Sequence, residues 1–284
     1  MRYQQVGSFS VFSWSIAGNE TCVGVHAGQM RFAFDMGFAP YPLISCDHVF
    51  ISHGHADHVG AIAQHMKKRR LNHLPNAVYY MHPCLIGHVR TLCKAFAAMS
   101  ELDETGQTEY DCTLVPILPE SRIKLGETGW SVEAIATHHT VQSQGYVLFS
   151  RDPSGDEDYP EIAYLGDSRF SVLKNARSVF PPLLSVRLLI MEATFLDRPE
   201  RLMERADAHG HTHLDELRQN CSLFKVSSSF VMELVHVGNV YLIHFSARYS
   251  NEQIERLTHM GMPSWLADRI VPSLCAQKCL ALDW

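Results

Sequence analysis

Five apolar runs of strand length recur along the chain, and each ends near a residue that can bind a metal ion or transfer a proton. The runs, with the residues that follow them, are 49–51 with His53, 132–135 with His138 and His139, 162–165 with Asp167, 188–191 with Glu192, and 240–243 with His244. A sheet fixes side chains at its strand ends while the adjoining loops leave them accessible. The sequence therefore predicts an α/β fold in which these polar residues form a site.

Other segments predict hairpins and helices between these runs. Residues 9–37 contain short apolar runs separated by turns at Gly18 and Gly28, which is typical of antiparallel strands. Val59, Ile62 and Met66 fall on one helical face, and the basic run 67–70 follows them. We interpret this run as a solvated helix end, with guidance of a phosphate as the alternative.

Two further helices are predicted from capping signals. One covers residues 214–224, with Thr212 and Asp215 at its start. The other begins at Ser250, where Gln253 completes a capping box, and stops at Gly261. Helices and strands therefore alternate along the chain.

Composition excludes several classes of protein. Hydrophobic residues make up 46% and charged residues 19% of the 284 residues, which favours a globular chain over a disordered one. No apolar stretch approaches the roughly 18 residues of a membrane span, and the N-terminus lacks signal-peptide features. We therefore expect a cytoplasmic protein with no membrane partner. The net charge of −6 argues against broad attraction to nucleic acid.

No repeat or linker is evident, so we expect one domain over residues 1–284.

The motif HGHADH at residues 53–58 carries the strongest chemical signal. The chain has 17 histidines, and histidine is the commonest metal ligand. His53 and His55 can bind one cation from a looped backbone, while Asp57 and His58 can reach a second. Imidazole nitrogen and carboxylate oxygen suit zinc and, less selectively, manganese or iron. The motif predicts a metal site.

The motifs HGHADH, GDS, MEATFLD, AHGHTH and HFSARY follow one another along the chain. Together they resemble the metallo-β-lactamase superfamily and, within it, the ribonuclease Z (tRNA 3′-processing endonuclease) branch, especially its short form. The resemblance implies a four-layer αββα sandwich with mixed sheets and with the metals at the sheet edge. It also implies that the chain can pair as a homodimer.

The resemblance implies two zinc ions per chain, with Mn²⁺ or Fe²⁺ as alternatives. One ion would be bound by His53, His55 and His139, the other by Asp57, His58 and His244, and Asp167 would bridge them. His139 is chosen over its neighbour His138 because the family places this ligand six residues before a Gly-Tyr pair, here at 145–146. Asp35 resembles an aspartate that orients ligating imidazoles, with turn capping as the alternative.

The resemblance also implies catalytic roles. Asp57 would accept a proton from the attacking water, and His211, oriented by Glu192, would donate one to the leaving 3′ oxygen. Arg248 would contact a substrate phosphate, with a structural ion pair as the alternative. Zinc lowers the pKa of bound water to about 7, which suits hydrolysis of a phosphodiester in precursor tRNA or in a smaller molecule. The products would carry a 3′-hydroxyl and a 5′-phosphate.

One part of the family pattern is missing. Many ribonuclease Z proteins insert a long basic arm that clamps tRNA where this chain has only residues 147–165. That segment is acidic, with Arg151 as its single basic residue, and an acidic segment repels phosphate. The family's serine and threonine after the histidine are also replaced here by Thr212 and His213. These departures concern tRNA specificity more than hydrolysis.

Three other functions remain as alternatives. A superfamily hydrolase of a thioester, lactone or β-lactam would share the HxHxDH motif but has no evident use for Glu192 and His211. A di-iron oxidoreductase usually has glutamate at the position of His55. A non-enzymatic RNA-binding module is disfavoured by the acidic balance of the chain.

Overall fold

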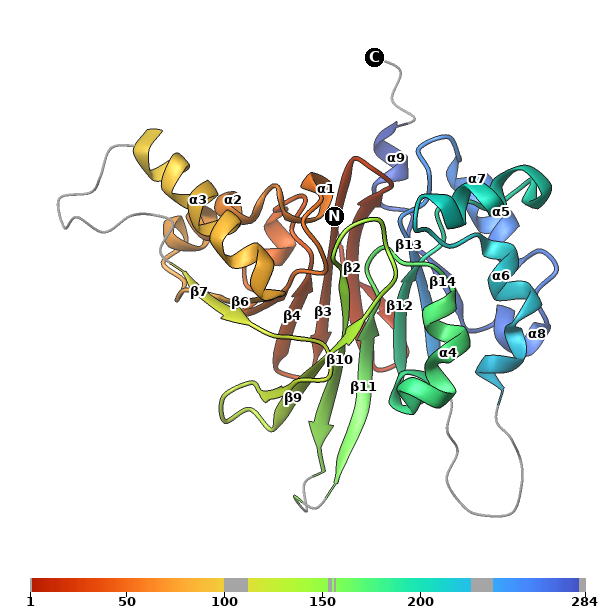
Figure 1. The fold of residues 1–284 in the computed structure, drawn as a ribbon, viewed down its shortest axis with the longest axis horizontal. Helices are drawn as coiled ribbons and strands as arrows, with labels where there is room; N and C mark the ends of the chain where they lie inside the picture. The colour runs from red at the N-terminus through yellow and green to blue at the C-terminus, as the bar shows by residue number, and fades with distance from the viewer. Residues whose placement is uncertain (1, 100–111, 153–154, 156, 226–236, 281–284) are drawn as a thin grey trace. The chain divides into compact units, whose positions relative to one another are not determined.

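A computed structural model describes residues 2–99, 112–152, 155, 157–225 and 237–280. The chain forms two compact units, Met1–Leu118 and Pro119–Trp284, and each is built around a seven-stranded mixed sheet (Figure 1). None of the helices in the described part of the chain is long and apolar enough to cross a membrane.

The sheet of the first unit begins with antiparallel hairpins and continues with parallel strands. Its strands, in spatial order, are β1 (Gln4–Val6), β2 (Phe9–Ile16), β3 (Glu20–Ala27), β4 (Met30–Phe34), β5 (His48–Phe50), β6 (Val78–Met81) and β7 (Thr113–Pro116). Pairing is antiparallel from β1 to β4 and parallel from β4 to β7. The predicted turns at Gly18 and Gly28 are confirmed, and both glycines have positive φ.

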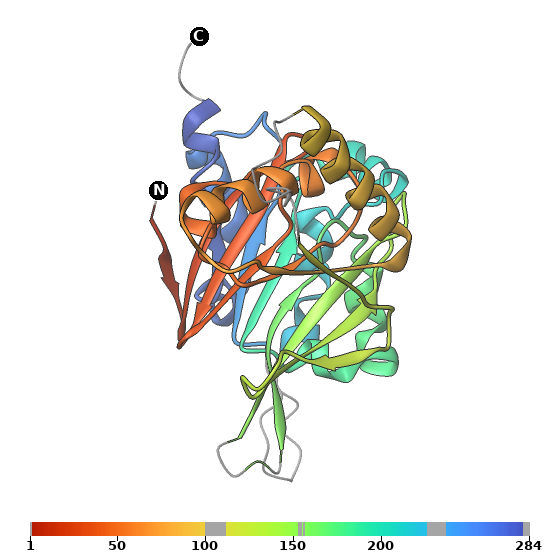
Figure 2. The ribbon, with the colours of Figure 1, turned by 90° about the vertical axis from the view of Figure 1, so that its left-hand side faces the viewer.

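Helices of the first unit lie after β5 and β6. They are α1 (Ala56–Val59), α2 (Ile62–Leu71) and α3 (Pro83–Met99), with a 3₁₀ turn η1 (Tyr41–Leu43) before β5. Figure 1 and Figure 2 show α2 and α3 beside each other over the sheet. The single helix predicted after the histidine motif is therefore two, separated at Gly60, where the chain turns between α1 and α2.

The basic run 67–70 is only partly solvated. Arg69 is buried, and its guanidinium donates to the carbonyl oxygens of Ile44, Cys46 and Pro75 and forms an ion pair with Asp47. A buried guanidinium with this many acceptors ties α2 to the chain around η1. The interpretation of the run as a solvated helix end is wrong for this residue.

The sheet of the second unit has the same strand arrangement as the sheet of the first. The strands of the second sheet are, in chain order, β8 (Arg122–Lys124), β9 (Trp130–Ala136), β10 (Gln144–Arg151), β11 (Asp158–Tyr164), β12 (Leu188–Glu192), β13 (Asn239–Ile243) and β14 (Ile270–Pro272). Pairing is again antiparallel for the first part, β8 to β11, and parallel from β11 to β14. The C-terminal ends of β9, β11, β12 and β13 consequently lie at the same edge of the sheet. All five apolar runs predicted as strands are strands.

One face of this second sheet packs against helices. The helices described in the second unit are α4 (Ser171–Val179), η2 (Pro181–Leu184), α5 (Pro199–Ala208), α6 (Leu214–Gln219), η3 (Cys221–Phe224), α7 (Asn251–His259), α8 (Ser264–Ala267) and α9 (Gln277–Leu280), of which α5 packs in a separate cluster with Phe195. Alternate residues of β12 and β13, such as Leu189 and Leu242, share one apolar cluster with Leu173, Leu217 and Ile254 of the helices. Figure 1 shows α4, α6 and α8 on the same side of β12. The residues of these strands that point the other way are buried as well, which explains the continuous apolar runs.

Two local predictions can be compared with the structure. The capping box at Ser250 and Gln253 is confirmed. The predicted N-cap of α6 is wrong by one residue. His213, not Thr212, occupies the N-cap and forms a capping box with Glu216. The Thr212 hydroxyl donates instead to the carbonyl of Ser168 at 2.8 Å. It therefore fastens the chain before α6 to the loop after β11.

Candidate metal centre

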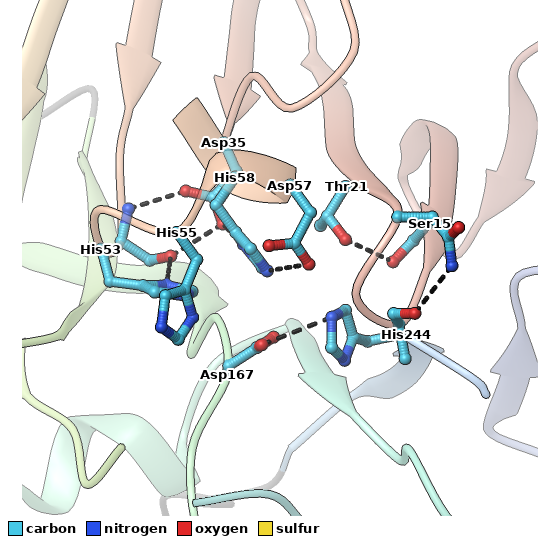
Figure 3. Close-up of polar contacts among 12 residues, drawn as sticks. Ser15, Thr21, Asp35, His53, His55, Asp57, His58, Asp167 and His244 are labelled. Carbon is cyan, nitrogen blue, oxygen red and sulfur yellow. Dashed lines mark hydrogen bonds and ion pairs between the residues drawn. The ribbon is translucent and has the colours of Figure 1, made fainter. Parts of the chain in front are cut away.

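The first unit contributes a group of imidazoles at the C-terminal end of β5. His53 and His55 lie in the loop after this strand, and their Nε2 and Nδ1 atoms face each other at 3.0 Å (Figure 3). His58 follows in α1, with its Nε2 3.4 Å from a carboxylate oxygen of Asp57. Gly37 allows this loop to pack closely, since a Cβ there would lie 1.7 Å from the carbonyl oxygen of Asp57. The whole HGHADH motif is thus gathered at one point of the first unit.

Asp35 orients two of these histidines through hydrogen bonds, one direct and one through Ser52. It is fully buried after β4, where its Oδ2 accepts from Nδ1 of His58 at 2.7 Å and from the hydroxyl of Ser52 at 2.8 Å. Its Oδ1 accepts from the backbone N–H of Ser52. Because the Ser52 proton points to Asp35, the Ser52 oxygen accepts the Nδ1 proton of His53 at 2.9 Å. We refer to Asp35, Ser52, His53 and His58 as the Asp35 network.

The second unit places its candidate donors along one sheet edge. His139 follows β9, Asp167 follows β11, and His244 follows β13. Nε2 of His244 lies 3.3 Å from a carboxylate oxygen of Asp167 (Figure 3). The donor atoms of His139, Asp167 and His211 all lie within 4.8 Å of one another. These side chains form a compact group of nitrogen and oxygen donors within the second unit.

His139, rather than His138, belongs to this group. Nδ1 of His139 donates to the carbonyl oxygen of Gly210 at 2.9 Å, whereas His138 is exposed and bonds to Ser171. Gly210 has φ +74° and a Cβ there would lie 2.7 Å from Nδ1 of His139, so only glycine fits without displacement. Burial lowers the pKa of His139, which keeps the ring neutral and able to act as a ligand at neutral pH.

Glu192 holds two histidines of the second unit in a similar way. It is buried at the end of β12, and its Oε1 accepts from Nδ1 of His211 at 2.9 Å and from the backbone N–H of Ser168. Its Oε2 accepts from the hydroxyl of Thr194 at 2.5 Å, and the Thr194 oxygen lies 3.1 Å from Nδ1 of His244. We refer to Glu192, Thr194, His211 and His244 as the Glu192 network.

Two residues of these networks have unusual backbone conformations. Asp35 has φ 55° and His244 has φ 62°, in the left-handed region that non-glycine residues seldom adopt. Such a conformation costs about 1–3 kcal/mol and persists where surrounding contacts fix it. Both residues come directly after a strand, Asp35 after β4 and His244 after β13.

Arg248 does not join the donor group in the second unit. It lies 3.6 Å from a carboxylate oxygen of Asp197, and its Nη2 lies 2.5 Å from the hydroxyl of Tyr249, which in turn donates to Asp197. Its guanidinium also lies over the rings of Phe195 and Tyr249. This is the ion pair that the sequence left as an alternative to phosphate binding.

Ser52 and Thr194 were not predicted as site residues. Each lies one or two positions from a residue that was, in the runs ISHGH and MEATF. Serine and threonine are common in loops, so their presence there is a weak signal. Their spacing from the carboxylates and imidazoles became visible only when the strands were placed side by side.

The donor chemistry of the two groups fits divalent metal ions. His58 and His139 donate from Nδ1 to a carboxylate and a carbonyl, and His53 and His244 donate from Nδ1 to hydroxyl oxygens whose own protons are used elsewhere. In its neutral form each of these rings carries the proton on Nδ1 and the lone pair on Nε2. In metal-ligating histidines the ring nitrogen that does not bind the metal, here Nδ1, typically donates its proton to such a partner. Carboxylates of Asp57 and Asp167 supply the oxygen donors.

Comparison with known proteins agrees with this geometry. The family model of the beta-lactamase superfamily domain matches residues 21–245. The crystal structure of the human short-form tRNase Z has a TM-score of 0.62 to this chain at 16% identity, over 93% of this chain and 96% of that one. The structure of the metallo-beta-lactamase fold protein YhfI of Bacillus subtilis gives 0.63 at 14% identity, over 94% and 97%. The predicted fold class, a mixed α/β metallo-β-lactamase fold, is thereby confirmed.

Two plant proteins are similar in sequence. The chloroplastic tRNase Z TRZ2 of Arabidopsis thaliana is 27% identical over 94% of this chain and 76% of that protein. The nuclear ribonuclease Z of Triticum aestivum is 32% identical over 55% of this chain and 83% of that protein. The chain therefore belongs to the beta-lactamase superfamily and, within it, to the ribonuclease Z branch.

Proposed function

We propose that this chain is a metal-dependent phosphodiester hydrolase that removes the 3′ trailer of precursor tRNA. The observation that carries the proposal is the ion pair of Glu192 and His211, 2.9 Å apart, at the sheet edge where Asp167 and His244 lie. A hydrolase whose leaving group is an alkoxide needs an acid at this point, whereas a hydrolase of thioesters expels a thiolate and does not. The names of the plant relatives supply the substrate class.

The proposed centre joins the donors of both units around two divalent ions. His53, His55 and His139 would hold one ion, Asp57, His58 and His244 would hold the other, and Asp167 would contribute a carboxylate to both. Zinc is the proposed metal because imidazole and carboxylate donors suit it, and Mn²⁺ or Fe²⁺ are the alternatives. When bound, such a pair lowers the pKa of water and stabilises charge on the phosphoryl oxygens.

The side chains perform the proton transfers in this proposal. Asp57 is partly exposed, so its carboxylate can accept a proton from the water that attacks phosphorus. The bond from phosphorus to the 3′ oxygen then breaks, and His211 gives its proton to that oxygen. Glu192 keeps the His211 ring oriented through Nδ1, so that Nε2 carries the transferred proton. The products are a 3′-hydroxyl on the tRNA and a 5′-phosphate on the trailer.

The test is to incubate the zinc-loaded protein with a precursor tRNA bearing a 3′ trailer and, in parallel, with bis-p-nitrophenyl phosphate. Cleavage of both is expected, with loss of both on chelation and recovery on return of zinc. The precursor should be cut to leave a 3′-hydroxyl. If the zinc-loaded protein cleaves neither substrate, the proposal is wrong.

A second candidate is hydrolysis of another phosphodiester, or of a thioester or lactone, in a small molecule. One observation favours it. Strand β10 ends at Arg151 and β11 begins at Asp158, so the hairpin has no room for a long RNA-clamping insertion. Half-buried Asp152 and exposed Glu157 lie between the two strands, and their negative charge opposes binding of a phosphate backbone. Cleavage of bis-p-nitrophenyl phosphate without cleavage of precursor tRNA would favour a small phosphodiester, and ester turnover alone would favour a thioester or lactone.

A further inference from the structure

One buried hydroxyl connects two histidines that the proposed reaction uses differently. The Thr194 hydroxyl donates to Oε2 of Glu192 at 2.5 Å, and its oxygen lies 3.1 Å from Nδ1 of His244. Since the Thr194 proton is used by the carboxylate, its oxygen accepts the Nδ1 proton of His244. Glu192 turns its other oxygen to Nδ1 of His211. A continuous chain of hydrogen bonds therefore runs from the proposed acid to a proposed metal ligand.

The backbone fixes Thr194 in this place. Strands β12 and β13 are parallel neighbours with Glu192 opposite Ile243. Just beyond the strand ends, the carbonyl of Thr194 accepts from the backbone N–H of Ser246 at 3.1 Å. This pairing sets the Thr194 side chain beside the ring of His244. Thr194 also sits two residues after Glu192, at a spacing that lets the hydroxyl reach back to the carboxylate.

Burial makes the hydroxyl hard to replace. Thr194, Glu192 and His244 are 4%, 1% and 1% exposed, so solvent has little access to the polar atoms between them. A hydroxyl removed from such a place deprives both a carboxylate oxygen and an imidazole N–H of a partner, and this loss is costly in a buried environment. The ring of His244 and the carboxylate of Glu192 would each be able to turn.

We infer that Thr194 is a positioning residue, which sets the ring of His244 for metal binding and holds Glu192 toward His211. This inference rests on the proposed metal centre. Its first consequence concerns metal affinity, because partners of the outer nitrogen of a ligating imidazole typically contribute 10–100-fold in affinity or activity. Its second consequence concerns the proton donor, because the same carboxylate orients His211.

The test compares Thr194→Val with Thr194→Ser. Valine keeps the size and β-branching of threonine but has no hydroxyl, while serine keeps the hydroxyl. Zinc affinity is measured by competition with a chromophoric chelator, which requires no catalytic turnover. Thr194→Val is expected to bind zinc about 10–100-fold more weakly, and Thr194→Ser is expected to recover most of the affinity.

Thr258→Val is the matched control. Thr258 is also fully buried in the second unit, and its hydroxyl donates to the carbonyl of Ile254 within α7 at 2.7 Å. This control loses a buried threonine hydroxyl that contacts no candidate donor, so zinc affinity should not change. Circular dichroism would establish that all three variants are folded. Folded Thr194→Val protein with the zinc affinity of the unmodified chain would overturn the inference.

A second readout follows the proton donor. At saturating zinc, Thr194→Val should slow cleavage of precursor tRNA more than cleavage of bis-p-nitrophenyl phosphate, because p-nitrophenolate leaves without a proton. A variant that merely loosens the fold would slow both equally. If zinc affinity depends on Thr194 but no phosphodiester is cleaved, the proposed function fails and the inference stands. If cleavage occurs and affinity does not depend on Thr194, the inference fails alone.

Discussion

The Asp35 network of the first unit and the Glu192 network of the second are built to the same plan. In each, a buried carboxylate after or at the end of a strand accepts from one backbone N–H, from one imidazole directly, and from one hydroxyl that accepts from a second imidazole. The hydroxyl is Ser52 in one network and Thr194 in the other. The difference lies in the imidazole that the carboxylate contacts directly.

The two imidazoles, His58 and His211, differ in how far solvent can reach them. The side chain of His58 is 0% exposed, whereas that of His211 is 17% exposed. A buried ring held through Nδ1 can present only a fixed lone pair to a metal ion, while a ring with access to solvent can also be reprotonated after it gives up a proton. The same carboxylate–imidazole pair therefore suits ligand orientation in the first unit and proton donation in the second.

The two networks also occupy comparable places in two sheets of the same topology. Each sheet has an antiparallel half followed by a parallel half, and each carries its network at the C-terminal ends of parallel strands. No sequence repeat predicted this correspondence. Strand order is set by pairing and packing of apolar faces, which many different apolar residues satisfy, so topology can recur without recurrence of the residues.

The largest expected effect is on proton donation by His211. We predict that His211→Ala lowers the rate of precursor tRNA cleavage about 10²–10⁴-fold, the usual contribution of a general acid, and that metal content is unchanged. Cleavage of bis-p-nitrophenyl phosphate should fall far less. His209→Ala is the matched control, because His209 is exposed in the same segment and bonds only to the Arg205 carbonyl among the contacts described. Equal losses of rate on both substrates would show that His211 does not donate a proton to the leaving oxygen.

The next effect concerns an imidazole, His65, that has no carboxylate partner among the residues that the structure describes. His65 is buried in α2 between the hydroxyl of Tyr79 and the carbonyl of Leu43, and burial lowers its pKa from 6.5 to about 4. The unfolded chain therefore binds this proton more readily. The stability from His65 is complete above pH 6.5 and is lost as the pH falls toward 4, by about 3 kcal/mol.

Urea unfolding at pH 7 and at pH 4.5 measures this contribution. His65→Gln should reduce the loss of unfolding free energy between the two pH values, since the half-buried His48 and His26 contribute equally in both proteins. An unchanged pH dependence in the variant would mean that burial of this imidazole does not control its protonation. Buried imidazoles with a carboxylate partner and those without one would then not differ in how burial affects their protonation.

The third prediction compares the two carboxylates. Asp35→Asn should weaken zinc binding about 10–100-fold, with losses of rate that are equal for precursor tRNA and bis-p-nitrophenyl phosphate at saturating zinc. Glu192→Gln should also slow the precursor more than the nitrophenyl ester, because it disturbs His211. Chelator competition and parallel rate measurements distinguish the two. If both variants show the same dependence on the leaving group, the networks do not differ in the way described.

The smallest expected effect concerns a histidine outside both networks. His213 caps α6, where its Nδ1 accepts from the backbone N–H of Asp215 at 3.0 Å, and burial lowers its pKa so that the accepting neutral form prevails. His213→Ala should lower the free energy of unfolding by about 1 kcal/mol. Zinc affinity should stay unchanged in a chelator competition. Weaker zinc binding would place His213 among the residues that support the centre.

Much of the fold was predictable from the chain, since strand-length apolar runs and turn glycines are local signals. The two units, the residues that share each sheet edge and the choice of His213 over Thr212 as a cap were not. Thr212 and Asp215 fit a capping box, yet the bond of Thr212 to Ser168 depends on a strand far away in sequence. Arg69 could have been found, because it lies seven residues after Ile62 on the buried face of α2.

The candidate site was predicted unevenly. Rare residues in a tight motif, such as His53 and His58, stand out in any chain. Ser52 and Thr194 do not, because a hydroxyl acquires its role only from the carboxylate and imidazole that tertiary packing places within 3.1 Å of it. Arg248 shows the reverse case, where a motif residue has a partner, Asp197, that its sequence position did not reveal.

The central claim is that donors of the two units bind the same pair of metal ions. Anomalous diffraction at the zinc edge from crystals of the zinc-loaded protein tests it most directly. We expect two zinc ions per chain, one bound by His53, His55 and His139 and the other by Asp57, His58 and His244, with Asp167 touching both. Zinc bound by the histidines of one unit alone, with the donors of the other unit turned away, would contradict it.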